Sequence, residues 1–158
     1  MPQPYYQNKV QILEDLFAKS VTVETDQIRV GDRVYPVVDD VIIILEPWQY
    51  PERVRQALGS ASVKGAASDF AEDIQFSFGA EWSKFQEVLP DHKELFRQYF
   101  DLIDLKTYHD KRVCDMGCGA GRFSYHFEPF CREIVLLDFS EAIFVARNNL
   151  RHSDKALF

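Results

Sequence analysis

The first third of the chain changes its hydrophobic period from helical to strand-like. Apolar residues in 5–19 recur at helical spacing, with Val10, Leu13 and Phe17 in one stripe. Beyond residue 20 apolar and polar positions alternate, and Gly31-Asp32 between two such runs predicts a hairpin turn. The apolar run 41–45 continues the strand pattern. We therefore expect a small helix-plus-β N-terminal domain over residues 1–58.

Residues 59–69 are mostly small and polar, which predicts a linker. The lead-in over 70–110 begins with an aromatic-rich segment, which we interpret as core rather than as a lid over a ligand. Its aromatic residues are Phe70, Phe76, Phe78, Trp82 and Phe85. Asp91 then predicts a helix start, with Glu94 as the reciprocal cap and an apolar face that runs to Ile103.

Residues 111–158 contain the sequence pattern that indicates a ligand-binding site. The run from Val113 predicts a strand, a loop with Gly117, Gly119 and Gly121, and then a helix start. A second buried strand, 134–137, ends in Asp138, and Ser140 predicts the cap of a further helix. We expect two strands and two helices from this part of the chain.

A carboxylate at the end of the second strand can accept hydrogen bonds from a ribose diol, so the pattern favours an adenosine-type ligand. Asp138 follows Gly121 by 17 residues (138 − 121). A dinucleotide fingerprint needs its third glycine one place later, where Arg122 stands, and a P-loop needs a Gly-Lys-Ser/Thr run that is missing. A tight turn without a ligand is the structural alternative.

The combination of Asp115-x-Gly117-x-Gly119-x-Gly121 with Leu137-Asp138-Phe139-Ser140 resembles the class I S-adenosylmethionine-dependent methyltransferases. A weaker likeness to some bacterial members covers residues 78–85. The resemblance implies that Asp115 and the 117–121 loop approach the methionine part of the cofactor. It also implies that Asp138 holds the ribose hydroxyls and that Phe139 lies near the adenine. The expected cofactor-binding residues are Asp115, Gly117, Cys118, Gly119, Gly121, Asp138, Phe139 and Ser140.

A second resemblance concerns residues 30–41, which are similar to the small β-domain of the Trm112 family. Many of those domains hold zinc through Cys-x-x-Cys pairs. Because the N-terminal half contains no cysteine, we expect no zinc site there. The spacing of Cys114 and Cys118 is poor for metal ligands. We interpret Cys118 as a small residue that fits between two glycines rather than as a nucleophile.

Composition excludes several classes of protein. The chain of 158 residues is 46% hydrophobic, and both 1–60 and 61–158 are net acidic within a total charge of −7, which does not favour nucleic-acid binding. The longest apolar run, Val41 to Leu45, is far shorter than the roughly 20 residues of a membrane span. Without a signal-peptide pattern and with three cysteines, we expect free thiols and a cytoplasmic protein.

The expected fold is α/β: an incomplete Rossmann-like (doubly wound) methyltransferase sheet preceded by a small β-rich N-terminal unit. A third strand is expected only beyond residue 158, so we expect a fragment of a longer enzyme or a sheet completed by another chain. An open edge beside residues 112–116 favours a homo-oligomer. The methyl acceptor and the catalytic residues are unknown. The isolated chain is expected to methylate nothing and to bind S-adenosylmethionine weakly or not at all. The alternatives are a non-catalytic interaction protein with a remnant loop and a nicotinamide-dependent oxidoreductase.

Overall fold

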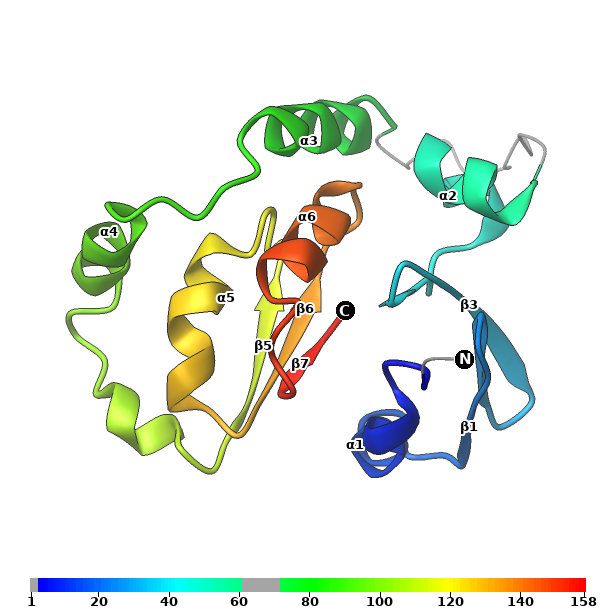
Figure 1. The fold of residues 1–158 in the computed structure, drawn as a ribbon, viewed down its shortest axis with the longest axis horizontal. Helices are drawn as coiled ribbons and strands as arrows, with labels where there is room; N and C mark the ends of the chain where they lie inside the picture. The colour runs from blue at the N-terminus through cyan, green and yellow to red at the C-terminus, as the bar shows by residue number, and fades with distance from the viewer. Residues whose placement is uncertain (1–2, 61–71) are drawn as a thin grey trace. The chain divides into compact units, whose positions relative to one another are not determined.

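The computed structural model describes residues 3–60 and 72–158. The chain divides into two compact units, Met1–Lys64 and Gly65–Phe158, and each is described by itself (Figure 1). One holds a curled antiparallel sheet and the other a parallel sheet, so the protein is mixed α and β. The predicted linker 59–69 lies, from residue 61 on, outside the described residues.

The N-terminal unit is a four-stranded meander with four short helical segments among its described residues. Its strands pair antiparallel in the order β1-β2-β3-β4, with Ile28 opposite Tyr35 and Val38 opposite Val41. The elements are a 3₁₀ helix Gln7–Lys9, α1 Val10–Phe17, β1 Val21–Val23, β2 Gln27–Val30, β3 Arg33–Val38, β4 Val41–Ile42, a 3₁₀ helix Pro47–Gln49 and α2 Glu52–Leu58. The first helix ends earlier than predicted because Ala18 adopts a left-handed conformation with φ 51°.

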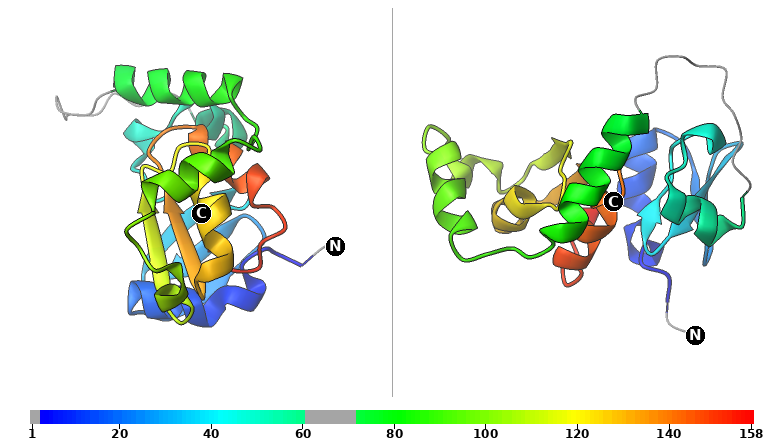
Figure 2. Two further views of the ribbon diagram at one scale, coloured as in Figure 1. Left: turned by 90° about the vertical axis from the view of Figure 1, so that its left-hand side faces the viewer. Right: turned by 90° about the horizontal axis from the view of Figure 1, so that it is seen from above.

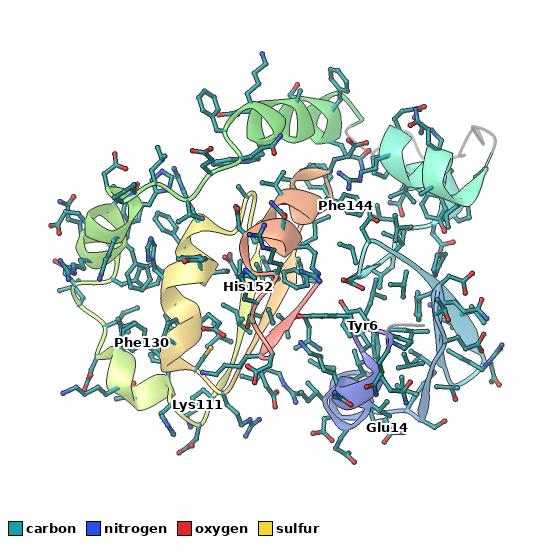
Figure 3. All side chains as sticks on the ribbon, viewed as in Figure 1. Tyr6, Glu14, Lys111, Phe130, Phe144 and His152 are labelled. Atoms are coloured by element: carbon teal, nitrogen blue, oxygen red, sulfur yellow. The ribbon has the colours of Figure 1, made fainter. Side chains whose placement is uncertain are left out.

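Two tight turns shape this meander. The predicted hairpin at Gly31-Asp32 is confirmed, and Gly31 supplies a φ of +56°. The turn between β3 and β4 uses Asp39 and Asp40, whose φ values of 48° and 63° are also left-handed. Arg53 forms an ion pair of 2.8 Å with Asp39, and the hydroxyl of buried Tyr6 donates to the Asp40 carbonyl at 2.7 Å (Tyr6 is labelled in Figure 3). These partners hold a turn for which glycine would be the usual choice.

The C-terminal unit contains a βαβαβ arrangement with three parallel strands in the order β5-β6-β7 (Figure 1). Asp115 stands opposite Leu136, and Ile134 stands opposite Ala156. The elements are α3 Glu72–Lys84, α4 His92–Tyr99, a 3₁₀ helix Leu105–Tyr108, β5 Arg112–Met116, α5 Arg122–Phe127, a 3₁₀ helix Glu128–Phe130, β6 Glu133–Leu137, α6 Ala142–Asn149 and β7 Ala156–Leu157.

The expectation of only two strands after residue 110 is wrong, because Ala156 and Leu157 form a third strand beside β6. Both side chains are buried, as is Phe158, so burial and pairing with β6 define this strand. β5 lies at the other edge of the sheet. Among the described residues no strand pairs with its outer side, so the expected open edge beside residues 112–116 is present within the described part of the chain.

The predicted cap of α4 is wrong in detail. Asp91 has φ −70° and ψ −20°, which is already helical, and its side chain makes no capping bond. Instead Leu89 N–H donates to Nδ1 of His92 at 3.1 Å. Only Phe96 is buried on this helix, against Phe127 of α5, whereas much of the predicted apolar face is exposed.

His126 lies on α5 beside the ring of Phe96, with centroids 5.7 Å apart. Its Nε2 is buried without a hydrogen-bond partner in the described structure. Burial lowers the pKa of His126 below its ordinary value, and the neighbouring side chains of His92 and Lys93 lower it further. The ring is therefore neutral in the folded unit near pH 7.

No helix within residues 3–60 or 72–158 is long and apolar enough to cross a membrane.

Candidate functional site

The glycine loop joins the end of β5 to α5. Gly117, Gly119 and Gly121 all have left-handed backbones, with φ values of 79°, 53° and 69°. The N–H groups of Gly117 and Cys118 both donate to the Leu137 carbonyl, at 2.7 and 3.1 Å. The loop therefore needs glycine for its geometry and is held at the carboxyl end of the neighbouring strand β6.

Asp138 connects the loop to the segment that follows β6. Its Oδ2 accepts the N–H of Gly119 at 2.8 Å. Its Oδ1 accepts both the N–H and the hydroxyl of Ser140, at 2.9 and 2.6 Å. A carboxylate oxygen has two lone pairs, so Oδ2 keeps the capacity to accept one further hydrogen bond from a ligand.

Ser140 is the predicted cap of α6, but the N-cap residue is Glu141, which makes no side-chain capping bond. The Ser140 hydroxyl, one residue before it, accepts the N–H of Ala142 at 3.2 Å. Asp115 lies inside β5, and its Oδ2 accepts a short hydrogen bond of 2.5 Å from the hydroxyl of buried Ser124. This bond connects β5 to α5 directly behind the loop. Phe139 is 37% exposed and its carbonyl accepts the side-chain amide of Gln75 at 2.6 Å.

Cys118 has the environment of a protonated thiol. Burial, followed by the negative charges of Asp138 and Asp115, raises its pKa strongly. Since the thiolate is the reactive form, this favours the expectation that Cys118 fills space rather than acting as a nucleophile. All three cysteines are free thiols, as predicted.

Helix α3 lies beyond the carboxyl ends of β5 and β6, across both loops (Figure 1; Figure 2, left). Gly79 faces the start of α6, where a Cβ on this glycine would make an ordinary contact of 3.5 Å with Cβ of Glu141. The indole of Trp82 covers Gly119, where a Cβ would lie 2.9 Å from the indole nitrogen. Position 119 therefore has no room for a side chain while Trp82 occupies this place.

The interpretation of the aromatic segment 70–85 as core is wrong for the two phenylalanines that can be assessed. Phe76 is 77% exposed and Phe85 is 65% exposed. The side chains of Phe70 and Phe78 lie outside the described residues. Trp82 is half-buried on the loop, so the face of α3 that contains Gly79 and Trp82 contacts the sheet end, and Phe76 points away from it.

Two further contacts fix the loop in place. At Gly121 a Cβ would lie 3.0 Å from Cβ of Ala146 and 3.2 Å from Leu150, so this glycine allows α5 to approach α6 closely. The side-chain amide of Asn149 donates to the carbonyls of both Gln86 and Ala120, each at 2.9 Å. Asn149 thus connects the segment after α3 to the glycine loop.

A cavity of about 680 Å³ opens beside this loop. It is bounded by the end of α3, the segment that leads to α4, and the first residues of α5. Its lining residues are Glu81, Trp82, Lys84, Phe85, Gln86, Glu87, Leu89, His92, Ala120 and Arg122.

The structure brings all eight expected cofactor-binding residues to the carboxyl ends of β5 and β6 or to the loops that follow them. Gln75 and Asn149 also contact these loops, and sequence patterns did not identify them. Among the described residues no three His, Cys, Asp or Glu side chains gather as a metal site. No protein-family model, no curated protein and no solved structure matches this chain.

Proposed function

We propose that the C-terminal unit is the cofactor-binding part of an S-adenosylmethionine-dependent methyltransferase. The hydrogen bond between Gly119 N–H and Asp138 Oδ2 carries the proposal. It joins the glycine loop after one parallel strand to the acid after the next, which is the arrangement that suits a nucleoside at the end of a parallel sheet.

Several properties of the residues present fit this cofactor. Asp138 retains acceptor capacity for a ribose hydroxyl, and Phe139 offers a partly exposed ring for the adenine. Gly117 has open space around its Cβ position, which leaves room for a ligand against the backbone. The carboxylates of Asp115 and Asp138 complement a positively charged ligand. Trp82 leaves no such room above Gly119, so it would form a wall of the site.

When bound, the cofactor would supply an electrophilic methyl group on a positively charged sulfur, so that an acceptor nucleophile can bond to the methyl carbon while the sulfur leaves as a neutral thioether. The chain's own contribution is positioning, since holding two reactants in the right geometry supplies much of the acceleration for such a transfer. Asp138 would orient the nucleoside, and the loop, whose Gly119 N–H donates to Asp138, would hold that carboxylate in place. Asp115, held by Ser124, would keep its charge at a constant place near the loop.

The test is a titration with S-adenosylmethionine followed by ligand-observed NMR, which detects millimolar affinities. A weak affinity is expected because the outer side of β5 carries no strand among the described residues. Asp138→Ala should weaken binding by about 1–3 kcal/mol, the cost of an unpaired polar group. The matched control is Asp154→Ala, which removes one exposed acid elsewhere in the same unit.

Circular dichroism of each variant separates lost binding from lost folding. Equal affinity of wild type and the Asp138→Ala variant would contradict the assignment of Asp138. Binding of NAD in place of S-adenosylmethionine would favour the oxidoreductase alternative. If the folded wild-type chain binds neither nucleotide, the proposal fails and the interaction protein becomes the better explanation.

A further inference from the structure

The cavity beside the glycine loop has the size of a small-molecule site, because its volume of about 680 Å³ is within the range of known ligand pockets. Trp82 lies between the cavity and Gly119: its indole covers Gly119 and also contacts Arg122, which lines the cavity. A molecule in this cavity would therefore lie one side chain away from the proposed cofactor site.

Arg122 provides the most specific group in the cavity. Its guanidinium carbon lies 5.3 Å from the ring centre of Trp82 and 5.0 Å from that of Phe123. Within the described part of the chain it forms no ion pair with a carboxylate. Contacts with two aromatic rings hold the guanidinium in place, and its planar fork of N–H groups suits the bidentate binding of a carboxylate or phosphate.

Two more donors line the same cavity. Lys84 forms no ion pair with any described residue. His92 accepts the N–H of Leu89 at Nδ1, so its neutral ring carries the proton on Nε2 and can donate it. Glu81 and Glu87 also line the cavity, but both are exposed, and neither is ion-paired with Arg122.

Apart from Gln86, the remaining lining is apolar, and its large side chains are partly open to water. Phe85 is 65% exposed and Leu89 is 44% exposed, and half-buried Trp82 lies beside them. Covering such side chains removes apolar area from water, which favours binding of a molecule with an apolar part. An inorganic anion would engage Arg122 but would leave this surface exposed.

We propose that this cavity binds an organic anion whose carboxylate or phosphate contacts Arg122 and whose apolar part covers Trp82, Phe85 and Leu89. This anion site is distinct from the proposed cofactor site, because Trp82 lies between the cavity and Gly119. The binding itself depends only on the groups that line the cavity.

The experiment uses Trp82 as its own reporter. The chain contains two tryptophans, so Trp48→Phe leaves Trp82 as the sole emitter. In this background phenylacetate should change the fluorescence saturably, and its neutral counterpart phenylacetamide should bind about tenfold more weakly or worse. Inorganic phosphate should compete with phenylacetate only at much higher concentration.

Arg122→Met should weaken phenylacetate binding about tenfold or more, because it removes the charged fork but keeps much of the aliphatic stem. The matched control is Arg97→Met, the same substitution at an exposed arginine of α4 that does not line the cavity. Equal binding of phenylacetate and phenylacetamide would overturn the proposal. Unchanged phenylacetate binding by the Arg122→Met variant would overturn it as well.

A second titration separates this proposal from the proposed function. Arg122→Met should leave the affinity for S-adenosylmethionine within a factor of two or so, whereas Asp138→Ala should weaken that affinity and retain phenylacetate binding. If phenylacetate binds through Arg122 but S-adenosylmethionine does not bind, the anion site stands and the methyltransferase assignment falls. If S-adenosylmethionine binds but phenylacetate does not, the anion site falls and the assignment stands.

Discussion

Replacing Gly121 by alanine should destabilise the C-terminal unit much more than the same change at Gly117. Both glycines have left-handed backbones, so an alanine at either position costs about 1–2 kcal/mol of conformational strain. A Cβ at 117 meets nothing within 4 Å, whereas a Cβ at 121 lies 3.0 Å from Ala146 and 3.2 Å from Leu150. Overpacking of this kind costs about 1–3 kcal/mol. Alanine also lowers the conformational entropy of the unfolded chain, and this effect is the same for both variants. The free energies of unfolding of the two variants should therefore differ by about 1–3 kcal/mol.

Urea unfolding followed by Trp82 fluorescence in the Trp48→Phe background measures this difference, because Trp82 belongs to the C-terminal unit. The double variant Gly121→Ala with Ala146→Gly should lose less stability than the sum of its single changes, since it restores part of the space. If Gly117→Ala and Gly121→Ala are equally destabilising, the added methyl group at position 121 is accommodated between α5 and α6 without loss of stability, and the reasoning is refuted.

Three further predictions concern other parts of the chain. Burial raises the pKa of the thiols of Cys114 and Cys118, but Cys114 is the more exposed of the two, so iodoacetamide should modify Cys114 first. Mass spectrometry after partial labelling measures the order of modification, and modification of Cys118 first would contradict this prediction. The lowered pKa of His126 means that below pH 6.5 the unfolded chain binds a proton that the folded chain does not, so stability falls as pH decreases. His126→Phe should flatten this dependence in urea titrations between about pH 7 and pH 5, and an unchanged slope would count against it. Asp40→Gly should stabilise the N-terminal unit by up to about 1 kcal/mol, because glycine adopts the left-handed backbone of this position without strain. Urea unfolding followed by Trp48 fluorescence in a Trp82→Phe background measures the change. A loss of stability would show that contacts of the aspartate side chain outweigh the backbone strain.

Local patterns along the chain were sufficient to predict the elements that carry the candidate site. The buried strand before Asp138 and the spaced glycines 117, 119 and 121 predict their own geometry, because each depends on neighbouring residues. The hairpin at Gly31 is predictable for the same reason.

The remaining features depend on contacts between distant residues. Trp82 covers Gly119 from 37 residues away (119 − 82), and no periodicity in α3 indicates which face meets the loop. β7 has two residues, which is too short to show alternation, and it is a strand only because β6 pairs with it. Asp91 has the residue type of a cap, but the turn that precedes α4 places it in a helical conformation. Tertiary packing decided each of these cases.

The pairing order of the two sheets has a consequence for how quickly each unit folds. In the antiparallel sheet every strand pairs with its neighbour along the chain, and Val30 pairs with Arg33 across a two-residue turn. In the parallel sheet Arg112 pairs with Glu133 only after a loop and a helix have been crossed. Closing longer loops costs more entropy before any contact forms, so folding slows as contacts become less local. The antiparallel unit also precedes the parallel sheet along the chain, so it leaves the ribosome earlier during synthesis. Both effects should allow the antiparallel unit to fold before the parallel sheet has been assembled.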